Sequence, residues 1–184
     1  MQVVPRCAVE RMRLEDIPAV QSIEREVFLS PWPKNAYRNE LLQNRHATYI
    51  VLRRDGEVSG YGGLWKVQQE AHITTIGVRA RDQGHGYGKT LFIALLQRAY
   101  GLGAHWVTLE VRRSNEHAMG LYESFGFTVI GRRRGYYTDN GEDAIIMWSN
   151  SIHAPAFKRA FLERLHAVDI PGIGPAPSPE YPLR

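Results

Sequence analysis

The first candidate site for chemistry is a glycine-rich segment between a predicted strand and a predicted helix. Gln83-Gly84-His85-Gly86-Tyr87-Gly88-Lys89 follows the β-branched run 71–78 and precedes a helical pattern that starts at Lys89. Glycines let the backbone approach an anion closely, and the unpaired N–H groups at a helix N-terminus attract one. The segment therefore predicts either a phosphate-binding loop or a strand-to-helix turn that binds no ligand.

Residues 83–90 also differ by one position from the phosphate loop of nucleoside-triphosphate enzymes. Gly88-Lys89-Thr90 fits that pattern, but Gln83 stands where its first glycine belongs. Three or four predicted strands precede the segment, and no apolar run ends in an aspartate suited to hold magnesium. These departures disfavour nucleotide hydrolysis.

A carboxylate and a phenol downstream could move protons. Glu110 lies on the predicted strand 105–111 on the same face as Trp106, and burial there would raise its pKa and make it a better base. Tyr122 lies on the predicted helix 115–124 and could act as a weak acid. Taken alone, an arginine-paired glutamate and a core tyrosine are the simpler interpretations. Cys7 has no evident histidine partner, which disfavours an acyl-cysteine intermediate.

Hydropathy patterns predict the elements that would position these groups. Strand-like runs occur at 8–13, 48–53, 58–67, 71–78, 105–111, 127–131 and 144–148. Helical spacing occurs at 17–27, 35–43, 89–99, 115–124 and from Pro155 onward. Asp55-Gly56 predicts a tight hairpin, and residues 132–143 a loop. This order predicts a mixed α/β fold: a central, mostly antiparallel sheet with one parallel strand–helix–strand unit and helices on both faces.

Length and composition predict one compact domain followed by a C-terminal extension. The chain has 184 residues, of which 43% are hydrophobic, so residues 1–150 can form one core. Residues 151–169 then predict an amphipathic helix docked on that domain, and the proline-rich residues 170–184 predict a flexible tail. One cysteine and the lack of any long apolar run predict a cytoplasmic protein without disulfides or a membrane span.

The net charge of +4 is concentrated in one part of the chain. Residues 71–113 carry six basic and two acidic side chains, whereas residues 114–150 carry three basic and five acidic ones. We interpret the basic excess as a local anion site around the glycine-rich segment and not as a nucleic-acid surface.

An ordered series of motifs resembles a known family. Gln83-x-x-Gly86-x-Gly88 after Ile76-Gly77-Val78 resembles the coenzyme A loop of the GNAT N-acetyltransferase superfamily, and the resemblance covers most of residues 8–150. The downstream motifs are similar to those of its ribosomal-protein-alanine N-acetyltransferases. They are Leu109-Glu110-Val111-Arg112, Ser114-Asn115, Leu121-Tyr122-Glu123-Ser124-Phe125-Gly126-Phe127, Tyr136-Tyr137 and residues 141–147.

The resemblance implies roles for individual residues, with acetyl-CoA as cosubstrate and no metal. Ile76, Gly77 and Val78 would bind the pantetheine arm through their backbone, and the N–H groups of Gly84, His85, Gly86, Tyr87, Gly88 and Lys89 the pyrophosphate. Asn115 would contact coenzyme A, Glu110 would accept a proton and Tyr122 would donate one. Gly84 and His85 occupy positions where the family often has basic or long polar residues, so cofactor affinity could differ.

The resemblance also implies where the acceptor binds. Trp32, Tyr136, Tyr137, Glu142 and Asp143 would flank the acceptor groove; their ordinary alternatives are loop anchoring for Trp32 and turn capping for Asp143. The expected reaction is direct acetyl transfer to the N-terminal alanine of a small-subunit ribosomal protein. Other protein N-termini, lysine side chains and small amines are alternative acceptors, and a non-catalytic ribosome- or RNA-binding module is the alternative from another class. Arg132-Arg133-Arg134 would make at most incidental nucleic-acid contact.

Overall fold

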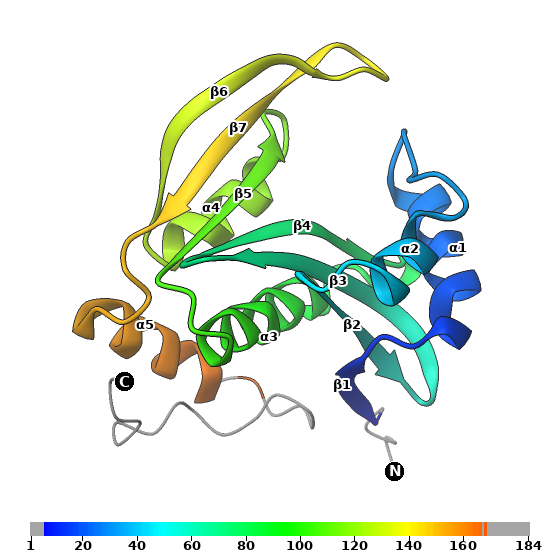
Figure 1. Cartoon of the computed structure of the whole chain (residues 1–184), viewed down its shortest axis with the longest axis horizontal. Helices are drawn as coiled ribbons and strands as arrows, with labels where there is room; N and C mark the ends of the chain where they lie inside the picture. Colours follow the sequence, from blue (N-terminus) through cyan, green and yellow to red (C-terminus); the bar gives the residue numbers. More distant parts are fainter. Residues whose placement is uncertain (1–5, 167, 169–184) are drawn as a thin grey trace.

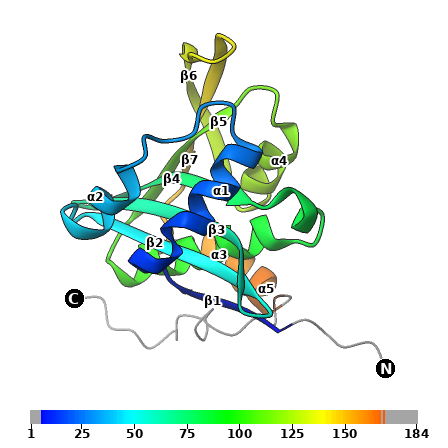
Figure 2. The same ribbon diagram turned by 90° about the vertical axis from the view of Figure 1, so that its right-hand side faces the viewer.

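A seven-stranded sheet organises the computed structural model, which describes residues 6–166 and 168 (Figures 1 and 2). The strand order is β1-β2-β3-β4-β5-β7-β6, and all neighbours are antiparallel except the parallel pair β4–β5. The fold therefore matches the predicted mixed architecture. The strands are β1 Cys7–Arg11, β2 Ala47–Arg54, β3 Glu57–Val67, β4 Glu70–Val78, β5 Trp106–Arg112, β6 Phe127–Tyr137 and β7 Glu142–Ser149.

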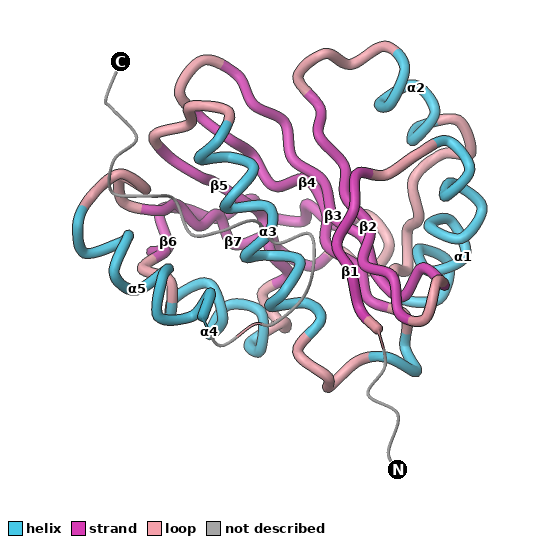
Figure 3. The backbone as a smooth tube through the Cα atoms, turned by 90° about the horizontal axis from the view of Figure 1, so that it is seen from below, coloured by secondary structure: helices cyan, strands magenta, loops and turns pink. Residues whose placement is uncertain are grey.

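Helices cover both faces of this sheet. On one face lie α1 Ile17–Val27 and α2 Ala36–Leu42; on the other lie α3 Tyr87–Gly101, α4 Glu116–Ser124 and α5 Pro155–His166. Figure 3 views the molecule from the side of α3 and α5. Short 3-10 turns at Leu14–Asp16 and Ala80–Asp82 precede α1 and α3. Each face thus has its own hydrophobic core, and no helix that the structure describes is long and apolar enough to cross a membrane.

Local sequence explains the predicted hairpin turn at Asp55-Gly56 and the end of α4. Asp55 and Gly56 have φ of 51° and 88°, and Arg54 pairs with Glu57, which makes the two-residue hairpin of a primed turn. Gly126, with φ of 82°, donates its N–H to Glu123 O just past the end of α4.

The predicted loop at 132–143 is wrong for most of its length. β6 continues to Tyr137 and β7 begins at Glu142, so only residues 138–141 connect them. Most of β6 is exposed, and the strand carries three consecutive arginines; its pairing with β7 shifts register twice. The alternation of apolar and polar residues that identifies a half-buried strand is therefore missing here.

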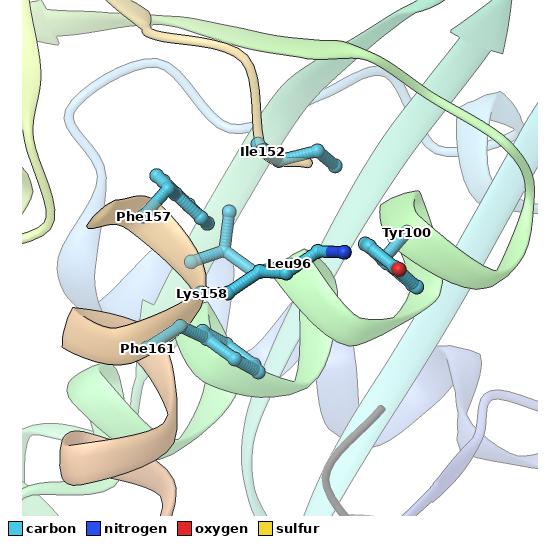
Figure 4. Close-up of a pocket in the computed structure, with 6 residues that line it drawn as sticks. All are labelled: Leu96, Tyr100, Ile152, Phe157, Lys158 and Phe161. Atoms are coloured by element: carbon cyan, nitrogen blue, oxygen red, sulfur yellow. The ribbon is translucent and has the colours of Figure 1, made fainter. Parts of the chain in front are cut away.

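The C-terminal helix packs against α3. Phe157, Phe161 and Leu165 of α5 are buried in the same core as α3, and Figure 4 shows Phe157 and Phe161 beside Leu96. The cavity that remains between them measures about 10 Å³, near the lower limit for one water molecule. This contact is hydrophobic packing, and the predicted tail at 170–184 lies outside the described residues.

The parallel strands β4 and β5 pair over only part of their length. Their pairing ends at Ile73 and Leu109, beyond which β4 runs on to Val78 without a β5 partner. Arg79 N donates to Ser59 O on the β3 side. Since successive N–H groups of a strand point to opposite edges, the Val78 N–H points into the gap between β4 and β5.

Candidate active site

A pocket of about 850 Å³ lies at this gap, on the side of α3 and α4. It is formed by the end of β4, the glycine-rich segment and the first two turns of α4. Its lining residues are Ile76, Val78, Gln83, Gly84, Gly86, Tyr87, Gly88, Lys89, Asn115, Glu116, His117, Ala118, Gly120, Leu121 and Tyr122. Nine of the predicted site residues thus meet in one cavity.

The glycine-rich segment exposes backbone to the pocket. Gly84 and Gly86 both have φ of 80°, and a Cβ on either would meet nothing within 4 Å. Gly86 is the N-cap of α3, whose first intrahelical bond runs from Thr90 N to Gly86 O. The N–H groups of the first turn are therefore free of helix partners and carry the positive end of the helix dipole.

Two predicted cofactor residues do not line this pocket. Gly77 faces the opposite side, where a Cβ would come within 2.6 Å of the Tyr61 ring. His85 turns toward its own loop, where Nδ1 lies 3.0 Å from Gln83 O, and its ring stacks on Tyr87. Either residue can contribute to the pocket only through its backbone.

Contacts from β1 and β2 support the glycine-rich segment and Asp82, which precedes it. Arg54 Nη1 donates to the buried Asp82 at 2.9 Å, and the Cys7 thiol donates to the Tyr87 hydroxyl at 3.4 Å. Burial, together with the Cys7 contact, raises the pKa of Tyr87 to about 12. Cys7 therefore supports the loop and does not face the pocket.

The two predicted residues on and before α4 also have structural roles. Asn115 is the N-cap of α4, and its side-chain oxygen accepts the Ala118 N–H at 3.1 Å. The Tyr122 ring packs 4.8 Å from Phe92, and burial raises its pKa to about 12. No partner for its hydroxyl is found in the part of the chain that the structure describes.

Glu110 lies on the other side of the sheet, next to the same gap. His72 Nε2 donates to its carboxylate at 2.9 Å, and Arg133 Nη2 lies at 3.3 Å. The hydrogen bond from His72 lowers the pKa of Glu110, and this effect outweighs burial, which raises it. The expected rise in pKa is therefore wrong. Trp106 is 39% exposed and does not provide the apolar cover that was expected.

The predicted acceptor residues fall into two groups. Trp32, in the loop between α1 and α2, stacks on Tyr37 at 5.3 Å, and its backbone N–H donates to the buried Glu24. Tyr136 is exposed on β6, and Tyr137 beside it stacks against Arg112, whose Cζ is 3.8 Å from the ring centroid. Trp32 does not line the large pocket, and its contacts fit the alternative of a loop anchor.

The carboxylates of Glu142 and Asp143 are occupied by neighbouring groups. Glu142 accepts the Ser114 N–H at 2.6 Å and pairs with Arg112, and the Ser114 hydrogen bonds lower its pKa to about 2. Asp143 accepts the Gly135 N–H at 2.9 Å. Neither is left free to attract an ammonium group, so both shape the end of the β6–β7 hairpin next to its turn.

The hairpin also touches the loop that carries Trp32. Asp139, at the tip of β6–β7, pairs with Arg112; this pairing, with a smaller contribution from Ser30 in the α1–α2 loop, lowers the pKa of Asp139. The two segments approach each other over the sheet in Figure 1. They do so beyond the C-terminal end of β5, where Arg112 pairs with Asp139.

The basic excess of residues 71–113 is mostly compensated elsewhere. Arg79 pairs with Glu26, Arg81 with Glu57, and Arg112 with Asp139 and Glu142, all of them acids outside that segment. The interpretation of this charge as a cofactor site is therefore wrong for most of these residues, and Lys89 is the one basic residue of this segment that lines the pocket.

His72 and Glu24 were missed by sequence analysis. His72 is 38 positions from Glu110, but β4 and β5 pair in parallel and bring it alongside. Glu24 is 2% exposed on α1 and accepts the hydroxyls of Tyr37 at 2.6 Å and Tyr61 at 3.0 Å. An acid on the apolar side of an amphipathic helix could have indicated it. Within residues 6–166 and 168, no cluster of three or more His, Cys, Asp or Glu could hold a metal ion.

Comparisons with known proteins agree with this arrangement. The chain is 46% identical over 143 residues to a putative ribosomal protein bS18-alanine N-acetyltransferase of Bacillus subtilis, covering 78% of this chain and 95% of that one. It is 37% identical to an N-alpha-acetyltransferase RimI of Mycobacterium tuberculosis, covering 74% and 87%. The crystal structure of the ribosomal-protein-S18-alanine N-acetyltransferase of Escherichia coli superimposes with a TM-score of 0.73 at 31% identity, covering 81% and 97%. Residues 17–127 match the acetyltransferase (GNAT) family, and the chain belongs to it.

Proposed function

We propose that the protein transfers the acetyl group of acetyl-CoA to a protein N-terminal amine, and that the N-terminal alanine of ribosomal protein bS18 is its preferred acceptor. The names of the B. subtilis and E. coli relatives support this acceptor. The structural observation that carries the proposal is the position of Glu110 at the β4–β5 gap, across the sheet from the 850 Å³ pocket. A ribosomal acceptor also puts the protein in the cytoplasm.

The pocket fits acetyl-CoA, which when bound supplies an acetyl thioester. A pyrophosphate suits the free N–H groups of residues 84–89 at the start of α3. The open space beside Gly84 and Gly86 leaves room for it. Ile76, Gly77 and Val78 would hold the pantetheine arm through their backbone, and Asn115 would contact the cofactor from the N-terminus of α4. Gly77 and His85 then act through main-chain atoms alone.

The proton acceptor in this proposal is Glu110. Its lowered pKa keeps it ionised at neutral pH. An α-amine has a reference pKa of about 7.7–8.0 and is partly neutral there, so a weak base suffices; a lysine amine at about 10.4 demands far more. A weak base such as Glu110 therefore suits an N-terminal amine better than a lysine side chain, whether Glu110 acts directly or through water.

Two further groups serve the reaction. The Val78 N–H points into the β4–β5 gap and is free to stabilise negative charge on a carbonyl oxygen. Tyr122 lines the pocket and, with its pKa raised to about 12, stays protonated, so its hydroxyl can donate to a departing thiolate. Trp32, Tyr136 and Tyr137 would form the aromatic walls of the acceptor groove, and Glu142 and Asp143 would hold its hairpin in shape.

A thiol-release assay over a peptide panel tests the proposal. The panel contains peptides that begin with alanine, serine or methionine, and an N-blocked peptide that contains lysine. We expect acetyl-CoA-dependent release of thiol with free N-termini, fastest with the first residues of bS18. Turnover confined to the N-blocked lysine peptide would overturn the α-amine assignment. Salt-sensitive RNA binding without any thiol release would instead indicate a non-catalytic module.

A further inference from the structure

All four tryptophans of the chain lie on the Glu110 side of the sheet or in the loop above it, and three of them form one surface. Trp65 on β3 pairs with His72 on β4, His72 with Thr108 on β5, and Thr108 with Trp148 on β7. Trp106 lies two residues before Thr108, and its β4 partner Glu70 pairs with Val67. We call the surface of Trp65, Val67, Trp106 and Trp148 the tryptophan face.

The side chains of this face point away from the core of α3. Leu64, Val107 and Met147 are buried in that core, so their neighbours Trp65, Trp106 and Trp148 project from the opposite side of the sheet. On that side α1 and α2 pack against β2, β3 and β4 (Figure 1). Trp65 is 37% exposed, Trp106 39% and Val67 52%, an unusual concentration of exposed large apolar side chains.

The face lies toward the end of β5 that is farther from the β6–β7 hairpin. That hairpin and the α1–α2 loop approach each other beyond the C-terminal end of β5 (Figure 1), so a bound polypeptide has more room to run toward the N-terminal end of β5. Trp106 lies at the other end of β5, four residues from Glu110, which corresponds to about 13 Å along a strand. An extended polypeptide with its amine at Glu110 would therefore cross the row of Trp65 and Trp148 near its third residue and reach Trp106 near its fifth.

Uncompensated carboxylates accompany these rings. Glu40 accepts hydrogen bonds from the Trp65 indole, the Tyr49 hydroxyl and the Asn44 amide; these donors are neutral, and within the described chain no basic side chain pairs with Glu40 to balance its charge. Glu70 lies in register with Trp106 and likewise has no ion-pair partner among the described residues. Aromatic rings flanked by acids attract lysine and arginine through cation–π and Coulomb interactions.

We infer that the tryptophan face binds the third to fifth residues of the acceptor polypeptide and selects lysine or arginine there. The inference rests on the proposed function, because the amine at Glu110 sets the position of the chain. The protein then recognises a short basic sequence in addition to the terminal residue. The ligand of the tryptophan face is the acceptor polypeptide itself, which binds there through the residues that follow its acetylated N-terminus.

Two sets of peptides measure this selectivity. One set has alanine first and lysine or arginine at positions three to five; the matched set has glutamine there, and an alanine-led dipeptide serves as a short acceptor. We expect the basic peptides to have the higher kcat/KM, by about twofold to fivefold for each basic residue, and the advantage to shrink as salt rises. Equal kcat/KM for the two sets would overturn the inference.

Substitutions on the face locate the effect. Trp106→Leu and Glu70→Gln should each reduce the preference for basic peptides by about twofold to fivefold and leave turnover of the dipeptide unchanged. Leu102→Ser and Glu163→Gln, which alter an exposed apolar and an exposed acidic residue away from the face, are the matched controls. Equal losses with the dipeptide, or a change in oligomeric state, would show that the face packs the fold or joins two copies.

Direct binding separates this inference from the proposed function. Fluorescence anisotropy of labelled basic and neutral peptides, measured without acetyl-CoA, gives their affinity for the tryptophan face independently of acetyl transfer. Stronger binding of basic peptides that Trp106→Leu removes supports the inference even where no peptide is acetylated, which would contradict only the proposed reaction. Equal binding of both sets, together with normal acetylation, contradicts only the inference.

Discussion

The two sides of the β4–β5 gap present different chemical groups: mainly backbone on one side and side chains on the other. The pocket side comes from residues 76–89 and the start of α4, and it presents backbone N–H groups, four pocket-lining glycines and one lysine. The Glu110 side is assembled from β3, β4, β5, the β6–β7 hairpin and the α1–α2 loop, and it presents side chains: Glu110, His72, Arg133 and the tryptophans.

This difference predicts which kinds of substitution impair the function of each side. A backbone site is sensitive to changes of φ and insensitive to the identity of most side chains. A side-chain site fails when a single functional group is removed, while the fold remains intact. The substitutions below test this contrast, beginning with the largest expected effect.

Glu110→Gln should have the largest effect on turnover. It removes the proposed proton acceptor but keeps the size of the side chain, so we expect kcat to fall by about 10²–10⁴ with an α-amine acceptor. Steady-state kinetics should show an unchanged KM for acetyl-CoA. Glu123→Gln, on an exposed position of α4, is the control. A wild-type rate in Glu110→Gln would remove Glu110 from the mechanism.

Gly86→Val should damage the pocket side alone. Valine is strained at φ of 80°, by roughly 1–2 kcal/mol, and the distorted N-terminus of α3 should lower kcat/KM for acetyl-CoA about fivefold to thirtyfold. Gly56→Val is the matched control, because Gly56 has φ of 88° in a hairpin away from the pocket. Both variants should lose similar stability in thermal unfolding. If Gly56→Val raised the KM for acetyl-CoA equally, the effect would be global strain.

Tyr122→Phe should have a smaller effect, although Tyr122 lines the same pocket. A thiolate leaving group, with a reference pKa of about 8.5, needs little protonation, so we expect kcat to fall by roughly tenfold or less. The hydroxyl has no partner among the described residues, so thermal stability should not change. A loss of stability with normal kcat would identify Tyr122 as a core residue only.

The same contrast explains which parts were predictable. The glycine-rich segment is local in sequence, and its turn, its helix start and the pocket beside it follow from a few adjacent residues. Glu110 was found from its motif, but its partners His72 and Arg133 come from other strands, and pairing register is needed to place them. The direction of its pKa shift was wrong for that reason. The exposed strand β6 and the internally paired arginines likewise depend on contacts that no local pattern encodes.

His72→Asn tests the most distant of these contacts and should have the smallest effect. The hydrogen bond from His72 holds the pKa of Glu110 below its ordinary value, so Glu110 stays ionised as pH falls toward that lowered pKa. Removing His72 takes away the largest effect that lowers this pKa and leaves burial opposed by Arg133 and a backbone hydrogen bond, so the pKa should rise and the acidic limb of the kcat–pH profile should move to higher pH.

The loss should therefore depend on pH. At acidic pH we expect turnover of His72→Asn to fall roughly twofold to tenfold, the range of one hydrogen bond to a charged group, and near pH 8 the loss should disappear. The lowered pKa also stabilises the folded protein above the ordinary pKa of a glutamate, and this contribution is lost as pH falls through the lowered value. Carbon-13 NMR of the Glu110 carboxyl measures the shift directly, with the exposed His46→Asn as control. A pH-independent loss would mean that His72 positions the acceptor and does not set the charge of Glu110.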